Sequence, residues 1–186
     1  MKITRPIRAV LFDMDGVMVD SEFVYMKYLL EFAKEKNPAV TMEDINQMVG
    51  RSRQDSWTVM ERAVNNGETW ETLIKEWAER DIYSRIDYRK IFRPEMKTTV
   101  QELKRRGYTV ALVSSTGPKL ISRIVEEVGM RPEFDLIVSG KQFKQSKPNP
   151  EIYHYTADTL GIREDECFVV EDSTVGIEAA YRAGMS

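Results

Sequence analysis

The chain has 186 residues, of which 42% are hydrophobic and 31% are charged, and its formal net charge is −3. This length fits one domain, or one domain with an insertion, and the apolar share is sufficient for a packed core. A small negative charge provides no basic field, so we expect no nucleic-acid partner. No apolar stretch approaches the ~20 residues that span a bilayer, so we expect no membrane partner.

The N-terminus and the cysteine content predict the compartment. Residues 1–6 contain no hydrophobic region of a signal peptide. The single cysteine, Cys167, lies in an apolar run, excludes an internal disulfide framework and is typical of a reducing environment. We therefore expect a cytoplasmic protein, a monomer or weak oligomer, in which Cys167 packs in the core.

Four short apolar runs rich in β-forming residues predict strands at residues 8–13, 108–114, 134–139 and 167–171. Helical patterns separate the last three runs. Residues 118–128 have apolar side chains at helical spacing and Gly129 follows them. A second helix is expected from Asn149-Pro150, with the proline at its first position, to Gly161, and a third from about Ser173. This alternation predicts an α/β fold, a Rossmann-like parallel sheet with helices on both faces.

The segment between the first two predicted strands is too long for a simple connection. Residues 21–90 contain several helical patterns and no convincing strand. A segment of about 70 residues inside a compact domain indicates a helical insert with its own small core. We therefore expect a core of residues 1–20 and 91–186 and a helical insert of residues 21–90. The insert leaves the core beside the first strand, where it could close over a site or stay permanently packed.

Two acidic residues end the first apolar run. Asp13 and Asp15 are spaced i and i+2, which places them on one face of a strand, and Gly16 allows a sharp turn directly after them. Two carboxylates held that close repel unless a cation or a shared proton compensates them. The pattern fits an ordinary strand-to-loop turn. It also fits a magnesium-assisted reaction at a phosphate, in which one carboxylate attacks and the other moves protons.

Hydroxyl groups and a lysine follow other predicted strands. Ser114, Ser115 and Thr116 stand where a strand meets the start of a helix, where they can cradle a phosphate or simply cap the helix. Lys147 lies in Ser146-Lys147-Pro148-Asn149-Pro150, a segment that two prolines stiffen. It is either directed into a site or solvated, as loop lysines usually are.

A second acidic pair, Glu171-Asp172, ends the fourth run and could bind a metal or cap the following helix. All of these groups follow the C-terminal ends of predicted parallel strands, which is the edge where open sheets bind ligands. A phosphoryl group adds negative charge to this anionic edge, so Mg²⁺ and Lys147 must offset it.

The ordered motifs Asp13-Met14-Asp15-Gly16, Ser114, Ser146-Lys147-Pro148 and Glu171-Asp172-Ser173 resemble the haloacid dehalogenase superfamily, in its branch of β-phosphoglucomutase-like phosphatases. The resemblance spans essentially the whole chain and implies an α-helical cap inserted after the first strand. It implies that Asp13 is a nucleophile that forms an aspartyl-phosphate. Asp15 would protonate the leaving oxygen and then activate water, Ser114 would bind the phosphoryl oxygens, and Lys147 would neutralise charge.

The resemblance also implies a metal ion and substrate contacts. Mg²⁺ would be held by Asp13, the backbone carbonyl of Asp15 and Asp172, with Glu171 assisting. From the residues themselves we also expect Gly16, Ser115 and Thr116 to contact the substrate, because the backbone can come close at Gly16 and the hydroxyls can cradle a phosphate. Within the insert, Gly50-Arg51-Ser52-Arg53 resembles the substrate loop of related caps, and Arg53 aligns with a phosphate-binding arginine. The alternative is that Arg51 and Arg53 are surface charges before a helix.

Two departures from the mutases of this branch favour hydrolysis. The mutases carry a histidine where this chain has Phe23-Val24-Tyr25, and an asparagine where it has Gly117-Pro118. The only histidine, His154, is expected to be structural. We expect a Mg²⁺-dependent phosphatase acting on a small phosphorylated metabolite, such as a sugar phosphate. The alternatives are a sugar phosphomutase and a non-catalytic phosphate-binding module.

The C-terminus departs further from the family pattern. Relatives are expected to continue with at least one more strand and a helix after Ala183-Gly184-Met185, so we interpret the end of this chain as a truncation. The run at residues 167–170 would then be an apolar sheet edge with unpaired backbone groups. This predicts poor solubility or a partner that covers the edge.

Overall fold

The computed structural model describes residues 6–49 and 51–186. These residues form two compact units. The core unit contains the described residues up to Asp20 together with Asp87–Ser186, and the helical unit is Ser21–Ile86. Most of the N-terminal segment on which the expected absence of a signal peptide rests, residues 1–5, lies outside the described residues. Within the described ranges, no helix is both long enough and apolar enough to cross a membrane.

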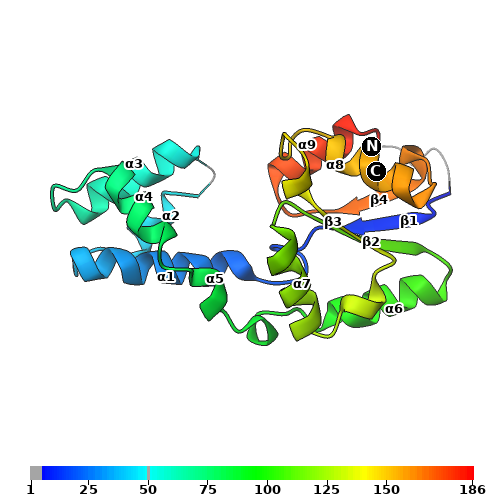
Figure 1. Ribbon diagram of the computed structural model, residues 1–186, viewed down its shortest axis with the longest axis horizontal. Helices are drawn as coiled ribbons and strands as arrows, with labels where there is room; N and C mark the ends of the chain where they lie inside the picture. Colours follow the sequence, from blue (N-terminus) through cyan, green and yellow to red (C-terminus); the bar gives the residue numbers. More distant parts are fainter. Residues whose placement is uncertain (1–5, 50) are drawn as a thin grey trace. The chain divides into compact units, whose positions relative to one another are not determined.

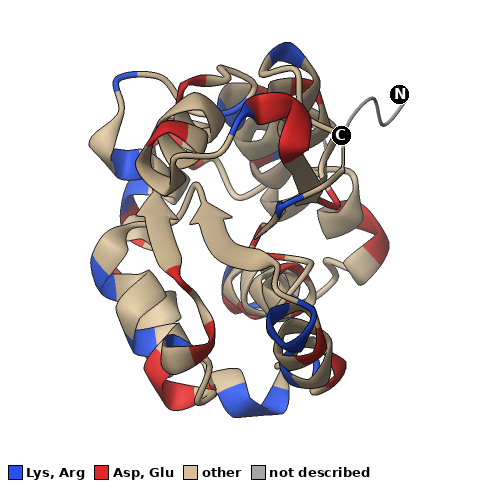
Figure 2. Cartoon of the chain, turned by 90° about the vertical axis from the view of Figure 1, so that its right-hand side faces the viewer, with Lys and Arg blue, Asp and Glu red and all other residues tan. Residues whose placement is uncertain are grey.

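The core unit contains a four-stranded parallel sheet in the order β3-β2-β1-β4. The strands are β1 (Ala9–Phe12), β2 (Thr109–Ser114), β3 (Leu136–Ser139) and β4 (Cys167–Val170). None of the strands contains a charged residue, so they are tan in Figure 2, whereas charges of both signs are spread over the helices. Continuous apolar strands of this kind are typical of parallel sheets that are covered on both faces.

Helices cover both faces of this sheet. They are α6 (Glu95–Arg105), α7 (Pro118–Glu127), α8 (Glu151–Leu160) and α9 (Thr174–Arg182), with short 3₁₀ turns at Tyr88–Lys90, Arg131–Glu133, Gly140–Gln142 and Glu164–Glu166. Figure 1 shows α8 and α9 on one face and α6 and α7 on the other. The predicted α/β fold with a parallel sheet is therefore confirmed. Pro150 is the N-cap of α8 and not its first helical residue, a one-residue difference at a helix end.

The helical unit consists of α1 (Ser21–Lys36), α2 (Met42–Asn46), α3 (Arg53–Val64), α4 (Trp70–Ala78) and α5 (Ile82–Arg85). An aromatic cluster lies at its centre. The Phe32 ring lies 6.2 Å from the Trp57 ring and 5.5 Å from the Trp77 ring, measured between centroids. Phe23, an apolar residue in the first turn of α1, is 56% exposed, whereas Met26 and Leu29 of the same helix are buried.

The chain returns to the core unit earlier than residue 91. Tyr88 is buried there, and its backbone N–H donates to Glu127 Oε1 of α7 at 3.0 Å. The Arg123 guanidinium lies over the Tyr88 ring, 5.4 Å from its centroid. These contacts place Asp87–Lys90 with the core unit, whereas the sequence pattern assigned them to the insert.

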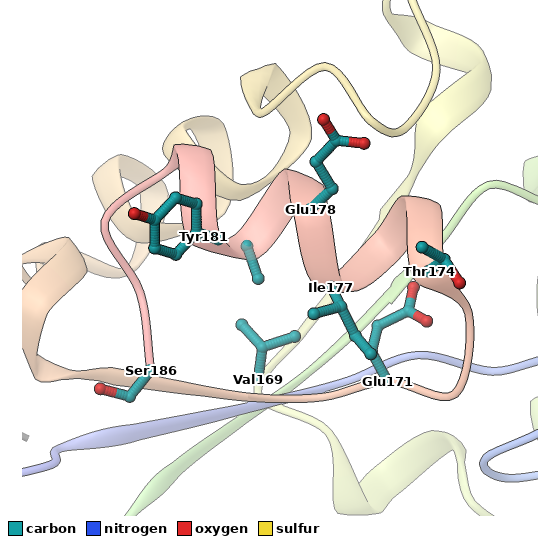
Figure 3. Close-up of a pocket in the computed structure, with 8 residues that line it drawn as sticks. Val169, Glu171, Thr174, Ile177, Glu178, Tyr181 and Ser186 are labelled. Atoms are coloured by element: carbon teal, nitrogen blue, oxygen red, sulfur yellow. The ribbon is translucent and has the colours of Figure 1, made fainter. Parts of the chain in front are cut away.

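Strand β4 lies at one end of the sheet, and the last residue of the chain pairs with part of it. The Ser186 N–H donates to the Cys167 carbonyl at 3.1 Å, and the Val169 N–H donates to the Ser186 carbonyl at 2.7 Å. The expectation of unpaired backbone groups along this edge is therefore wrong at these two positions, because Gly184 turns the chain back toward β4 after α9. A groove remains between β4 and α9, where Val169, Ile177 and Tyr181 are among the lining residues (Figure 3).

Candidate active site

The turn after β1 carries both predicted carboxylates. Asp13 extends the ladder by one residue, since its N–H donates to the Val170 carbonyl of β4 at 2.9 Å. Gly16 follows with φ +79° and donates its N–H to the Val19 carbonyl at 2.8 Å. A Cβ atom at Gly16 would lie 1.8 Å from Asp172 Oδ2. A glycine is thus required here both by the turn and by the close approach of Asp172.

The Lys147 ammonium lies at the centre of the site. It donates to Asp13 Oδ1 at 2.7 Å, to Glu171 Oε1 at 2.7 Å and to the Val113 carbonyl at 3.2 Å. The Lys147 side chain is only 3% exposed, so it is directed into the site and is not a solvated loop lysine. Burial alone would lower the pKa of Lys147. The charge of Asp13 and the hydrogen bonds to both carboxylates outweigh burial and raise this pKa, so the lysine stays protonated.

Glu171, the first residue of the second acidic pair, accepts hydrogen bonds through both of its carboxylate oxygens. Glu171 accepts from Lys147 through Oε1, while Oε2 accepts from the Ser173 N–H at 2.9 Å and the Ser173 hydroxyl at 2.8 Å. Ser173 also caps α9, because its hydroxyl accepts from the Gly176 N–H at 3.1 Å. The helix-capping interpretation therefore applies to Ser173. Burial opposes ionisation of Glu171, but Lys147 outweighs it and lowers the pKa of this carboxyl.

Asp13, Glu171 and Asp172 form a cluster that could hold a cation. One carboxylate oxygen from each lies within 4.8 Å of the others. Burial, opposed by Lys147, raises the pKa of Asp13 to about 7, and the charges of Glu171 and Asp15 add to this effect. Burial and the charge of Glu171 also raise the pKa of Asp172. Such mutual repulsion among oxygen donors fits the requirements of Mg²⁺, which prefers carboxylate ligands and would offset the charge.

The three predicted hydroxyl residues after β2 differ in their surroundings. Ser114 is 1% exposed and accepts the Thr116 N–H through its hydroxyl at 3.1 Å. Ser115 is exposed. The Thr116 hydroxyl donates to Asp15 Oδ2 at 2.8 Å. The structure thus brings Thr116 to the Asp15 carboxylate and joins Ser114 to the backbone of Thr116, whereas substrate contacts of Ser115 and Thr116 stay predictions.

Arg53 belongs to the helical unit. It is the exposed first residue of α3, after the N-cap Ser52. Arg51 is also exposed and donates to the Gln47 carbonyl, and Gly50 lies outside the described residues. Contact between Arg53 and a substrate stays a prediction. His154 lies on α8, where its Nδ1 is 3.0 Å from Glu164 Oε1.

Three residues that support the site were missed from the sequence. Ser139 ends β3 as Ser114 ends β2, so a hydroxyl directly after an apolar run was the available signal. Gly176 is a glycine in the first turn of a helix, where it costs about 1 kcal/mol relative to alanine. A Cβ atom there would lie 1.7 Å from Glu171 Oε1, which explains why this position needs a glycine. The Tyr153 ring lies 5.2 Å from the Lys147 ammonium, and no local pattern indicates this contact.

Comparisons with known proteins agree with this geometry. A family model described as haloacid dehalogenase-like hydrolase matches residues 10–186. "Putative phosphatase YhcW" of Bacillus subtilis is 29% identical over 96% of this chain and 81% of its own length. The "Phosphorylated carbohydrates phosphatase" of Thermotoga maritima is 26% identical over 96% of this chain and 82% of its own.

A solved structure has the same fold. The crystal structure of a "putative beta-phosphoglucomutase" from Thermotoga maritima superposes with a TM-score of 0.78 at 26% identity, covering 96% of this chain and 82% of that one.

Proposed function

The chain belongs to the haloacid dehalogenase-like hydrolase family and is an enzyme, and from this premise we propose that it is a Mg²⁺-dependent phosphatase that acts through an aspartyl-phosphate. The substrate class is a small phosphorylated metabolite, such as a sugar phosphate. The observation that carries the proposal is the buried Lys147 ammonium between Asp13 and Glu171, beside Asp172, at the C-terminal edge of the sheet. One lysine balances only part of this negative charge, and a phosphate adds more.

Asp13 is suited to attack phosphorus. It is buried at the end of a strand, and the Lys147 hydrogen bond holds one of its oxygens in place. In the first step, an Asp13 oxygen forms a bond to phosphorus and the bond from phosphorus to the ester oxygen breaks. The protonated Asp15 carboxyl gives its proton to that leaving oxygen, so the alcohol departs neutral.

The second step returns the enzyme to its starting state. The Asp15 carboxylate takes a proton from water, and the water oxygen bonds to phosphorus. The bond from phosphorus to the Asp13 oxygen breaks, which releases phosphate and restores both carboxyl groups. The Ser114 hydroxyl can donate to a phosphoryl oxygen at this strand edge, and the charge of the buried Lys147 ammonium offsets the charge of the phosphoryl group. Gly16 lets the backbone approach the phosphoryl group closely.

Asp13, the backbone carbonyl of Asp15 and Asp172 would hold the Mg²⁺ ion, with Glu171 assisting. When bound, the ion supplies positive charge that offsets the carboxylates and the phosphate. The oxygen donors of the cluster and the raised pKa values of Asp13 and Asp172 support this assignment. Glu171 assists by holding Lys147 at 2.7 Å.

A screen of phosphorylated metabolites for released phosphate tests the proposal. We expect release in the presence of Mg²⁺ and none in EDTA, with activity restored when excess Mg²⁺ is returned. Phosphate on the protein that is trapped during turnover, and that neutral hydroxylamine releases, would mark the acyl phosphate. Release that is equal with and without Mg²⁺ contradicts the metal assignment, and the absence of release from every compound contradicts hydrolysis.

A sugar phosphomutase is a second candidate, because the solved structure with the TM-score of 0.78 is described as a putative beta-phosphoglucomutase. In that reaction the aspartyl-phosphate would pass its phosphoryl group to a hydroxyl of the bound sugar. Incubation with sugar phosphates separates the two activities: isomerised sugar phosphate without phosphate release indicates the mutase. The absence of the mutase histidine and asparagine is why hydrolysis is proposed first.

A further inference from the structure

We propose that Thr116 is a positioning residue that orients the Asp15 carboxyl for proton transfer. The inference rests on the proposed function, since it assigns a partner to the acid and base of that reaction. It differs from the sequence prediction, in which Thr116 contacts the substrate. A positioning role requires that Thr116 is itself held in place and contacts Asp15, and the structure shows both kinds of contact.

The backbone of Thr116 is held from both sides. The Ser139 hydroxyl at the end of β3 donates to the Thr116 carbonyl at 2.6 Å. The Thr116 N–H donates to the hydroxyl of Ser114 at the end of β2 at 3.1 Å. Ser114 and Ser139 are both buried, and they are paired in register on neighbouring strands. Two sheet strands therefore fix the position of Thr116, although it lies in the loop that follows β2.

The side chain of Thr116 connects this fixed backbone to Asp15. Its hydroxyl donates to Asp15 Oδ2 at 2.8 Å, across 101 residues of sequence. A threonine is β-branched, so its χ1 angle is restricted and the direction of its hydroxyl is well defined. Asp15 is half-buried and lies beyond the end of β1, where its backbone forms an isolated bridge with Val19.

A carboxyl that moves protons needs an accurate position more than it needs a charge partner. A displacement of about 1 Å in a reacting group can cost about 100-fold in rate. Loss of the Thr116 hydroxyl should therefore lower kcat. It should leave substrate binding nearly unchanged, because Ser114 and Lys147 are untouched. If Thr116 bound the substrate instead, loss of its hydroxyl should raise KM and leave kcat nearly unchanged.

The test compares two substitutions at one position. Thr116→Val keeps the shape and both backbone hydrogen bonds but removes the hydroxyl, and Thr116→Ser keeps the hydroxyl. We expect Thr116→Val to lower kcat about 10- to 100-fold. KM and the inhibition constant of inorganic phosphate should change by less than about threefold. Thr116→Ser should keep kcat within about threefold of the wild type.

A matched control and a readout independent of activity complete the test. Thr98→Val removes an exposed hydroxyl on α6 that donates only to a backbone carbonyl, and it should leave kcat unchanged. Crystal structures of both Thr116 variants should show the Asp15 carboxylate reoriented in Thr116→Val and retained in Thr116→Ser.

Three results would overturn the inference. One is a raised KM with unchanged kcat in Thr116→Val, which makes Thr116 a substrate contact. Another is equal loss in Thr116→Val and Thr116→Ser, which makes its role structural. The third is an Asp15 carboxylate that keeps its orientation in Thr116→Val. A wild-type enzyme that releases no phosphate overturns the proposed function instead, and is recognised before any variant is made.

Discussion

The core unit and the helical unit use charge in opposite ways. In the core unit, the Lys147 and Glu171 side chains are 3% exposed and the Asp13 side chain is 10% exposed. The helical unit buries an aromatic centre and keeps its charges near the surface. Lys36 pairs there with Glu68 and Glu76, and Arg80 pairs with Glu35 and Glu76.

This difference indicates that the buried charges of the core unit serve the reaction, whereas the aromatic centre of the helical unit serves stability. Burying two charges costs several kcal/mol per ion, and replacing a buried pair by apolar residues often stabilises a protein. The pair between Asp13 and Lys147 is thus better explained by what it does to a phosphate than by what it does for folding. In the helical unit the aromatic centre provides the stability, since surface ion pairs contribute only about 0–1 kcal/mol each.

Two natural probes report on the units separately. All three tryptophans, Trp57, Trp70 and Trp77, lie in the helical unit, and the single cysteine, Cys167, is buried in the core unit. Burial raises the pKa of the Cys167 thiol to about 12, so it should react with alkylating reagents only when the core unit opens. Tryptophan fluorescence and thiol labelling can therefore follow the two units in one unfolding experiment.

The largest effect is expected for Asp13→Asn, which removes the nucleophile and retains its shape. We expect kcat to fall roughly 10⁴- to 10⁶-fold, and no phosphoenzyme to form. Phosphate release under saturating substrate and Mg²⁺ is the measurement. Asp158→Asn, an exposed substitution on α8, is the matched control and should behave as the wild type. Full activity in Asp13→Asn would refute the mechanism and the functional account of the buried pair.

Lys147→Met should combine a loss of activity with a loss of stability. It leaves the Asp13 and Glu171 carboxylates buried without their shared cation, which should cost about 3–5 kcal/mol without Mg²⁺. Loss of one charge-stabilising donor should lower kcat about 10²- to 10³-fold. We expect the urea midpoint for Cys167 labelling to fall more than the midpoint for tryptophan fluorescence, and Mg²⁺ to restore part of the loss.

The exposed Lys144→Met is the control for the lysine substitution and should change neither midpoint. Equal shifts of both probes in Lys147→Met would show that the two units unfold together, which would remove the basis for assigning stability to each unit separately.

Phe32→Ala should destabilise the helical unit without a direct effect on the charged site. Phe32 is fully buried against Trp57 and Trp77, so its truncation should lower the free energy of unfolding by about 3–5 kcal/mol. The fall in the urea midpoint should be greatest when unfolding is followed by tryptophan fluorescence. Unlike the fall for Lys147→Met, it should be the same with and without Mg²⁺. Phe23→Ala, exposed on the same helix, should change stability by less than about 0.5 kcal/mol.

The smallest effect is expected for Lys36→Met, at most about 1 kcal/mol near neutral pH. Hydrogen bonds from Asn66 and Lys36 lower the pKa of Glu68, and hydrogen bonds from Lys36 and Arg80 lower that of Glu76. A lowered pKa in the folded state adds stability above the usual glutamate pKa, and this is lost as the pH falls. Lys36→Met should therefore cost less at about pH 3 than at about pH 6, measured by urea unfolding with Lys34→Met as control. A constant cost would show that its role is packing.

Several residues of the candidate site could be proposed from the sequence because they follow apolar runs. Asp13, Ser114 and Glu171 stand directly after or at the end of strands, and parallel strands present these ends at one edge. The expectation that Gly16 allows a sharp turn was also confirmed, since its φ is +79°. Helix patterns located the insert, but the exposed Phe23 and the early return at Asp87 show that apolar spacing alone does not identify the buried stripe or the boundary.

The sequence by itself determined the parallel α/β architecture and the order of the motifs, because period and turn chemistry are local properties of a chain. Only the tertiary structure decided which side chains contact each other. Lys147 reaches Asp13 across 134 residues, and Thr116 reaches Asp15 across 101. Such pairs depend on strand order and register, which follow from the packing of the whole sheet, and no local pattern encodes them.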